Sequence, residues 1–492
     1  MRNVSLAVLL VAGIALGMMT GVAVAQTSAA TLTTLVNFGN SNGMNPVGGL
    51  AQGLDGDFYG MIYVPGRILK NNLAYKITTA GVFTSLTYKC TGCYGAKPGD
   101  ALVLAADGYL YGTTSAGGTN GDGTIVQASG IGLNTIYSFC SLPACADGSA
   151  PYAPLTLGND GNLYGTTLSG GANGTGTVFV VTTQGVETVL HSFNSTNDGG
   201  PSGLVLATDG NFYGTTSQGG TGTACSGGTV GCGTVFRITP QGTLTTLYSF
   251  CQLTNCPDGY YPSGLIQAAD GDLYGTTYRG GNGLISSGTS GTVFKITTQS
   301  TFTTLYKFCS LANCADGYSP SGVTQGTDGN LYGGAYGGPG PTCKNAYYGC
   351  GILYQMTTTG TPTTLYSFCP LGSCANSSAP APLTQGTDGN FYGVTYYGGN
   401  KASGTAFKLN VGLGPFVRTV MSSGTVGSSV IILGTSLTGA SKVTFNGVSA
   451  AFTVVSSSEI TATVPAGATT GAVVVTTRSA SLKSNRNYQV TN

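Results

Sequence analysis

One short motif constrains this chain more than any other feature: D-G-x-[LF]-Y-G occurs seven times, at steps of 49 to 61 residues. An apolar segment precedes each copy, and segments resembling G-T-V-F-x-I-T and T-T-L-Y-x-F follow it. Short runs rich in β-branched and aromatic residues, bounded by Gly, Pro or Asp, are typical of strands. We therefore expect four strands per repeat, here called a, b, c and d, with the D-G turn between a and b. The turns of repeats 1 to 7 begin at Asp55, Asp107, Asp160, Asp209, Asp270, Asp328 and Asp388.

The two ends of the repeat region indicate a closed ring. Residues 33–38 have the d-strand pattern but no repeat precedes them, whereas the last repeat stops after its c strand at 404–409. Seven complete sets result only if the N-terminal strand joins the last repeat, which removes the free edges of an open array. We therefore predict an all-β chain with a seven-bladed β-propeller over residues 31–410, closed by its N-terminal strand.

Strand direction sorts the connections onto two faces. The short a–b and c–d turns share one face, the turn face, and the d–a and b–c loops share the other, the loop face. All 14 cysteines fall in connections of the loop face, in seven close pairs. Paired cysteines in an exported chain predict disulfides. Zinc is the weaker alternative, because the single histidine, His191, is not near a cysteine pair in sequence. The expected disulfides are Cys90–Cys93, Cys140–Cys145, Cys225–Cys232, Cys251–Cys256, Cys309–Cys314, Cys343–Cys350 and Cys369–Cys374.

The first 25 residues have the features of a signal peptide. Arg2 supplies the positive start, an apolar run continues to about Val22, and Ala23-Val24-Ala25 has the small-x-small pattern of a cleavage site. A membrane anchor is the less favoured interpretation, because the run is short and ends at that site. No later stretch is apolar enough to span a membrane. We therefore expect an exported protein, secreted or at the cell surface, with the periplasm as the alternative.

Composition excludes one class of partner and weakens the case for catalysis. Charged residues make up 7% of the chain and the net charge is +1, so no basic surface for nucleic acid is expected. Most of the 17 acids occupy repeated positions, which favours turn-building over a catalytic carboxylate pair. His191 aligns with tyrosines of other d strands and is expected to replace a packing ring. We expect no catalytic residue, no metal site and no cofactor; for calcium, the ligand spacing of known binding loops is absent.

The repeat D-G-N-[LF]-Y-G-T-T…G-T-V-F-[KR]-I-T…T-T-L-Y-S-F resembles the GloVer-type tandem repeat of exported bacterial proteins, from about Thr31 to Leu409. That resemblance implies an exported location but no activity; the family often has an apolar C-terminal anchor, which we do not expect in this chain. Residues 411–492 resemble an IPT/TIG domain, an immunoglobulin-like module, in stretches such as V-I-I-L-G at 430–434 and V-T-F-N-G at 443–447. Such modules act as spacers or adhesion units in bacterial surface proteins.

Tyrosines distinguish the loop face of repeats 5 to 7. The b–c loops open with Ser or Leu in repeats 2 to 4, but with tyrosines in repeats 5 to 7. Exposed tyrosines suit sugar rings or protein partners, although packing against the disulfide loops would also explain them. The predicted ligand-binding residues are Tyr278, Arg279, Tyr336, Tyr396 and Tyr397.

These features predict a monomeric, non-enzymatic binding or adhesion protein that presents its loop face to a glycan or a surface protein. The alternative is an extracellular polysaccharide lyase or hydrolase with its site at the propeller channel. A group of acids, Arg and Tyr over the channel would favour the enzyme, whereas tyrosines away from any acid would favour binding.

Overall fold

The computed structural model describes residues 30–39, 42–62, 72–88, 97–129, 132–194, 198–223, 225, 231–281, 290–338, 351–368 and 378–491. The predicted signal peptide, 1–25, lies outside them. Within the described residues the chain is all-β, as expected: it has no α-helix, and its helical pieces are two 3-10 turns, η1 (Pro143–Cys145) and η2 (Ala312–Cys314). None of these residues forms a helix able to cross a membrane.

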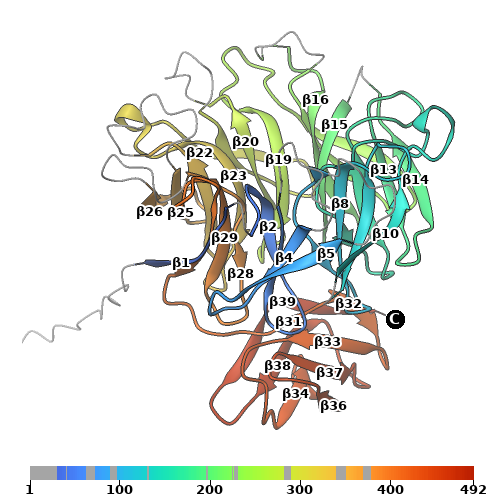
Figure 1. Ribbon diagram of the computed structural model, residues 1–492, viewed down its shortest axis with the longest axis vertical. Helices are drawn as coiled ribbons and strands as arrows, with labels where there is room; N and C mark the ends of the chain where they lie inside the picture. Colours follow the sequence, from blue (N-terminus) through green and yellow to red (C-terminus); the bar gives the residue numbers. More distant parts are fainter. Residues whose placement is uncertain are drawn as a thin grey trace, which may run out of the picture.

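Repeats 3 to 6 each form one antiparallel four-stranded sheet, with the strands side by side in sequence order. The sheets are β11 (Thr156–Leu157), β12 (Leu163–Thr167), β13 (Thr177–Val181) and β14 (Glu187–Ser192); β15 (Asp198–Leu206), β16 (Phe212–Gly219), β17 (Thr234–Ile238) and β18 (Leu244–Ser249); β19 (Tyr260–Gln267), β20 (Leu273–Arg279), β21 (Thr292–Ile296) and β22 (Phe302–Lys307); and β23 (Tyr318–Gln325), β24 (Leu331–Tyr336), β25 (Gly351–Met356) and β26 (Pro362–Phe368). The predicted order of strands a, b, c and d is therefore observed in these repeats (Figure 1).

The N-terminal strand completes the last repeat, as the sequence predicts. β1 (Thr31–Asn37) pairs antiparallel with β30 (Thr405–Asn410), which continues to β29 (Phe391–Tyr397) and then to β27 (Ser378–Pro380) and β28 (Thr384–Gln385). Repeat 7 also contacts repeat 1 directly, because the Thr384 hydroxyl donates to the Leu50 carbonyl over 2.6 Å. The sheets thus succeed one another along the chain, and the last one lies against the first.

Repeats 1 and 2 are joined into one nine-stranded sheet, which the sequence pattern did not indicate. It runs β2 (Pro46–Gln52), β3 (Phe58–Ile62), β4 (Asn72–Ile77), β5 (Phe83–Tyr88), β10 (Gly132–Ser138), β9 (Thr124–Ser129) and β8 (Leu110–Ala116), which pairs with β6 (Lys97–Pro98) and β7 (Val103–Leu104). The link is a two-residue parallel pairing between the two outer d strands, β5 and β10. Because d strands are edge strands, they keep free backbone groups for such a contact.

The D-G turn is one hydrogen-bonded unit, which explains why the motif recurs. In each of the seven turns, one carboxylate oxygen of the Asp accepts the backbone amide two residues later, and the other accepts the tyrosine hydroxyl four residues later. In repeat 4, Asp209 accepts the Asn211 amide over 3.0 Å and the Tyr213 hydroxyl over 2.7 Å. The prediction that these aspartates build turns is therefore confirmed.

The final glycine of the motif lets the b strand pack against an aromatic ring from the c strand. A Cβ at Gly214 would lie 2.5 Å from Cζ of Phe236, and one at Gly275 would lie 2.6 Å from Cζ of Phe294. A side chain at these positions would collide with the ring, so glycine is required for this close approach.

Two repeats carry tyrosine instead of phenylalanine at that ring position, and each leaves a buried hydroxyl. The hydroxyls of Tyr75 and Tyr354 have no hydrogen-bond partner among the described residues. Because an unpaired buried polar group is destabilising, Tyr354→Phe should raise the free energy of unfolding by about 1 kcal/mol in denaturant titrations. The matched control is Tyr213→Phe, which removes a hydroxyl that does have a partner and should destabilise. If both variants lost the same amount of unfolding free energy, this expectation would be wrong.

The C-terminal residues form two sheets around a separate hydrophobic core. One sheet contains β31 (Arg418–Thr419), β33 (Ser429–Leu433), β37 (Glu459–Thr463) and β36 (Phe452–Val454). The other contains β32 (Ser423–Thr425), β39 (Ser481–Thr491), β38 (Gly471–Thr476), β34 (Lys442–Phe445) and β35 (Val448–Ser449). Their shared core includes Val430, Ile432, Phe445, Val475 and Tyr488, all buried.

This C-terminal module is seated on the turns of the repeats. Arg418 donates to the Gln52 carbonyl over 3.1 Å, and Arg486 donates to the Gln267 carbonyl over 3.2 Å. Further hydrogen bonds reach the turns of repeats 1, 3 and 4. Desolvation lowers the pKa of Arg418 to about 10, so this guanidinium stays charged at neutral pH, and desolvation also lowers the pKa of Arg486. The module thus covers the turn face, while the described loops that contain η1 and η2 lie toward the opposite end of the repeats (Figure 1).

Candidate binding face

Disulfides shape the connections opposite the C-terminal module. Cys140–Cys145, Cys225–Cys232, Cys251–Cys256 and Cys309–Cys314 are bonded, so these four predictions are confirmed. The other three predicted pairs, Cys90–Cys93, Cys343–Cys350 and Cys369–Cys374, lie outside the described residues.

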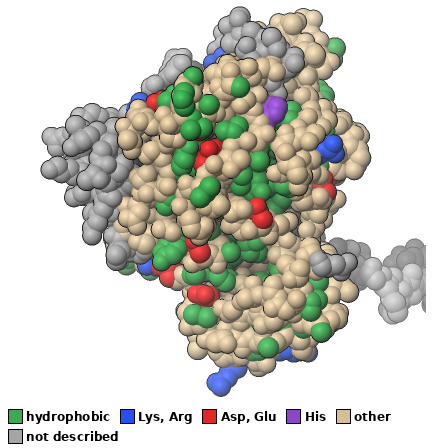
Figure 2. All heavy atoms as spheres, turned by 90° about the vertical axis from the view of Figure 1, so that its right-hand side faces the viewer, with side chains coloured by type: hydrophobic (Ala, Val, Ile, Leu, Met, Phe, Trp, Pro, Cys, Tyr) green, Lys and Arg blue, Asp and Glu red, His purple; other side chains and the backbone are tan. Residues whose placement is uncertain are grey.

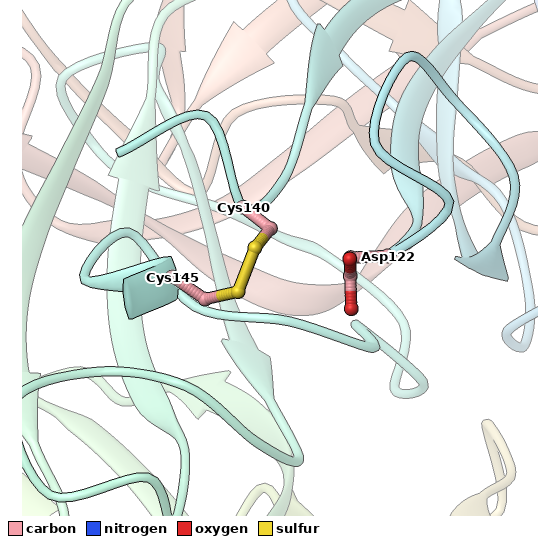
Figure 3. Close-up of side chains that lie close together, drawn as sticks. All are labelled: Asp122, Cys140 and Cys145. Atoms are coloured by element: carbon pink, nitrogen blue, oxygen red, sulfur yellow. A yellow bond between two sulfur atoms is a disulfide. The ribbon is translucent and has the colours of Figure 1, made fainter. Parts of the chain in front are cut away.

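One group near a disulfide has the composition of a metal site but not its chemistry. An oxygen of Asp122 and the sulfurs of Cys140 and Cys145 lie within 4.8 Å of one another (Figure 3). The two sulfurs are bonded to each other, whereas the thiolate is the form of cysteine that binds metal. Asp122 already accepts a 2.6 Å hydrogen bond from the Ser149 hydroxyl. We interpret this group as a structural contact between two loops.

The aspartates of the C-x-D-G loops are also structural. The carboxylates of Asp147, Asp258 and Asp316 each accept a tyrosine hydroxyl from the preceding d strand, over 2.8, 2.9 and 2.7 Å. Each also accepts a backbone amide at the start of its own loop. These three acids therefore tie the loops to the sheets, although the second carboxylate oxygen of Asp258, Oδ1, is buried without a donor among the described residues.

His191 takes the place of one such tyrosine. Its ring lies 5.1 Å from that of Phe193 in an edge-to-face contact, and Tyr248 makes the same contact with Phe250 at 5.1 Å. This geometry agrees with the packing role expected for His191.

Four repeats contribute tyrosines that lie near the loop-face ends of strands a and b. Tyr336, the last residue of β24, lies 6.4 Å from the ring of Tyr278 at the end of β20, and 6.5 Å from the ring of Tyr318 at the start of β23. Burial and the neighbouring phenols Tyr278, Tyr397, Tyr152 and Tyr318 raise the pKa of Tyr336 to about 12. We call these five residues, centred on Tyr336, the tyrosine cluster.

The cluster remains accessible although protein surrounds it. Tyr152 is 55% exposed and Tyr278 is 42% exposed. Burial nevertheless raises the pKa of Tyr152. The tyrosine cluster is thus available to a ligand from the loop face.

The other predicted ligand-binding residues lie beside the cluster. Tyr396 packs edge-to-face on Tyr397, with ring centroids 4.6 Å apart. Arg279 directs its guanidinium to the ring of Tyr261, with its Cζ 5.7 Å from the ring centroid. Arg279 does not contribute to the raised pKa of Tyr336, the residue at the centre of the cluster. Four of the five predicted residues therefore belong to or adjoin the tyrosine cluster, and Arg279 faces a neighbouring loop.

Sequence reasoning missed Tyr152 and Asp100. Tyr152 is the only aromatic residue directly after the proline that opens strand a; the other repeats have Val, Gly, Ser or Ala there. Asp100, two residues after the corresponding proline of repeat 2, raises the pKa of Tyr152 through its negative charge. Both residues depart from the repeat pattern, and that departure was the available signal.

Charge elsewhere on the molecule is sparse. Figure 2 shows isolated charged side chains among mostly uncharged ones on the side that includes β13 and β14. No cluster of Lys and Arg is visible on that face, in keeping with the net charge of +1.

The fold and the cluster define a class: an all-β protein built of tandem four-stranded sheets, with tyrosines gathered at the loop ends of its strands. The family model described as the Gloeobacter/Verrucomicrobia repeat matches residues 66–223 and 221–453, most of the chain, so the chain belongs to this family. The second match extends past residue 410 into the C-terminal module. No curated protein matches the chain.

Several solved structures are similar to the chain at low identity. The luciferin-regenerating enzyme has 10% identity and a TM-score of 0.40, covering 79% of this chain and 97% of its own. The PQQ-bound aldose sugar dehydrogenase from Streptomyces coelicolor has 14% identity and a TM-score of 0.39, covering 78% and 99%. A protein of unknown function from Bacteroides thetaiotaomicron has 14% identity and a TM-score of 0.38, covering 72% and 85%. At these scores, the likenesses do not bear on function.

Proposed function

We propose that this chain is an exported seven-bladed β-propeller with an immunoglobulin-like IPT/TIG domain at its C-terminus, and that it binds a ligand without transforming it. The four-stranded sheets, one per D-G turn, and the contact between the last and the first sheet support the propeller. The two sheets around one core support the immunoglobulin-like domain. Four disulfides fit an extracellular location.

One observation carries the binding proposal: Tyr336 lies among four other tyrosines, two of which keep about half of their surface exposed. Tyrosines supply rigid apolar surface with a polar tip, which suits the faces of sugar rings and protein side chains. The carboxylates that could form a catalytic pair are largely committed to turns and loops, as the hydrogen bonds of the D-G and C-x-D-G aspartates illustrate. We therefore favour a glycan or a surface protein as the ligand, over a polysaccharide-cleaving enzyme.

The test is binding of the mature protein to arrays of glycans and bacterial surface proteins. We expect Tyr278→Ala with Tyr336→Ala to weaken binding at least tenfold, because both rings would be lost from the contact surface. Tyr109→Ala is the matched control: Tyr109 is 44% exposed but lies in the D-G turn of repeat 2, on the covered face. Unchanged binding by the double variant, with its fold verified by circular dichroism, would refute the role of the cluster. Depolymerisation of a screened polysaccharide by the wild-type protein would instead establish the enzyme alternative.

A further inference from the structure

Four of the loops on the loop face share a leucine in addition to their paired cysteines. The motif C-x-L-x-x-C follows the d strand of repeats 2, 4, 5 and 6. The other positions between the two cysteines differ from loop to loop, whereas the leucine is present in all four. Leu142, Leu253 and Leu311 are among the described residues, and we call them the leucine tips. The fourth, Leu371, lies outside the described residues.

The three described loops have the same backbone conformation. In each of them the amide of the second cysteine donates to the leucine carbonyl, over 3.0, 3.1 and 3.0 Å in chain order. The first cysteine has a φ of 58°, 59° and 57° in the same order. Each loop is also closed by its disulfide. The chain therefore presents each leucine in the same way, on a loop whose shape is restrained.

The leucine tips are exposed to solvent. The exposed fraction is 51% for Leu142, 67% for Leu253 and 56% for Leu311. A single exposed leucine is ordinary on a protein surface, but the same residue exposed at the same place in three loops indicates a common cause. Packing within the fold is not that cause, because each side chain keeps more than half of its surface in contact with solvent.

The loops that carry the leucine tips offer no charge to a partner. Residues 140–147, 251–258 and 309–316 contain no Lys, Arg or Glu, and each has one acid, the aspartate of the C-x-D-G sequence. That aspartate accepts a backbone amide of its own loop in all three cases. A partner at these loops would therefore be recognised by apolar contact and not by ion pairs.

The leucine tips lie at the same end of the repeats. η1 and η2 directly follow Leu142 and Leu311 in sequence, and both lie away from the C-terminal module (Figure 1). In the proposed propeller, equivalent loops are repeated radially at one level of the ring. The three side chains are then separate apolar points that face one surface together.

We propose that the leucine tips dock the protein on the surface of a zwitterionic lipid bilayer. Apolar side chains bind a bilayer by burial at the boundary between headgroups and acyl chains, and the absence of Lys and Arg from these loops matches a surface without net charge. A bilayer accepts each separate leucine independently, whereas a folded partner would need a matching pocket for each one. The exposed rings of Tyr152 and Tyr278 on the same face agree with this partner, because tyrosine is enriched at membrane interfaces. Bilayer docking goes beyond the proposed ligand binding by the tyrosine cluster and uses different residues.

A fluorescence experiment tests whether a tip enters the bilayer. The chain has no tryptophan, so Leu253→Trp introduces a single indole. When phosphatidylcholine vesicles are added to the mature full-length protein, we expect the emission of this indole to shift to the blue as it leaves water. Val186→Trp is the matched control, because Val186 is 64% exposed but lies between β13 and β14 on the turn face. An emission that vesicles leave unchanged in Leu253→Trp would overturn the proposal.

Co-sedimentation with the same vesicles measures the affinity. Replacing all three leucine tips with serine should weaken vesicle binding about tenfold, because contacts on one rigid body reinforce one another. Val82→Ser with Val186→Ser removes side chains of similar exposure from the turn face and should leave binding unchanged. Raising the salt concentration from about 0.1 M to about 1 M should not weaken binding by the wild-type protein, since the contact is apolar. Binding that requires anionic lipid, or that is lost at high salt, would overturn the proposal.

The remaining outcomes separate bilayer docking from loss of folding and from the proposed ligand binding. If the triple serine variant melts below wild type, the emission of Leu253→Trp decides, because that variant keeps a large apolar side chain at the tip. A protein that ignores vesicles but binds an array protein through the leucine tips would refute bilayer docking and identify a protein partner. Vesicle binding that depends on the leucine tips, together with no array ligand for the tyrosine cluster, would support bilayer docking and refute the proposed function.

Discussion

Replacing Gly214 with alanine should lower the free energy of unfolding by about 3 kcal/mol. The added Cβ would lie 2.5 Å from Cζ of Phe236 and 2.9 Å from Cδ2 of Leu204, both of which are buried side chains. Neither side chain can move without displacing its neighbours in the hydrophobic core. The loss of unfolding free energy therefore comes from overpacking. Chemical denaturation followed by circular dichroism would measure it.

Two further variants assign the effect to this contact. Gly414→Ala is the control, because nothing lies within 4 Å of its Cβ position and its backbone is not in the left-handed region. Phe236→Leu in the Gly214→Ala background should recover part of the loss by removing the ring from the collision. If Gly214→Ala were as stable as Gly414→Ala, the explanation of the motif's last glycine would be wrong.

Replacing Glu187 with leucine should stabilise the protein at pH 7 by roughly 2 kcal/mol. Glu187 stands where the d strands of repeats 4 and 5 have Leu244 and Phe302, and Phe302 stacks on Tyr248 of the preceding repeat at 3.9 Å. Glu187 instead places Oε2 3.5 Å from the Tyr137 hydroxyl, while its buried Oε1 has no partner among the described residues. Burial and the charge of Asp147 raise its pKa to about 7. The whole pKa shift of Glu187 would correspond to a gain in unfolding free energy larger than about 2 kcal/mol. We expect a smaller gain because the side chain is partly exposed and solvent screens its charge.

The pH dependence follows from the direction of that shift. Between about pH 4.5 and 7 the folded protein holds a proton on Glu187 that the unfolded chain has released, so the free energy of unfolding falls as the pH rises through this window. Glu187→Gln and Glu187→Leu should both remove this slope, and only the leucine variant should also gain packing. Unfolding titrations at pH 4.5, 6 and 7.5 would measure the difference from wild type. A wild-type slope that persists in Glu187→Gln would show that other groups cause it.

The local structure of the repeats follows from the sequence because it depends on short-range chemistry. An Asp that accepts an amide two residues later and a hydroxyl four residues later makes its turn wherever D-G-x-x-Y occurs. The same holds for the disulfides between cysteines five or seven positions apart, four of which are observed. Even the pairing of β1 with β30 could be predicted, because an incomplete set of strands at each end leaves only one complete arrangement.

The site depended on contacts between repeats, which no single repeat encodes. The tyrosine cluster draws Tyr152 from repeat 3 beside tyrosines of repeats 5, 6 and 7, more than 100 residues apart in sequence. Arg279 adjoins Tyr278 in sequence, yet it packs on Tyr261 because successive residues of a strand point to opposite sides. The seating of Arg418 and Arg486 on the turn carbonyls, which leaves the loop face open, has no counterpart in any motif.

The sequence by itself therefore determined the repeating unit: four strands, a D-G turn between the first two, and loops with paired cysteines. The hydrogen bond from the motif's Tyr to its Asp, and the packing of the motif's last glycine against an aromatic ring, became visible in the structure. These features arise from hydrogen bonds and packing between residues close together in the chain or at matched strand positions. Only the tertiary structure decided which side chains come together, such as the rings of Tyr278, Tyr318 and Tyr336. The physical reason is that the packing of different sheets against one another juxtaposes the ends of strands from different repeats, so the composition of the site depends on several repeats at once.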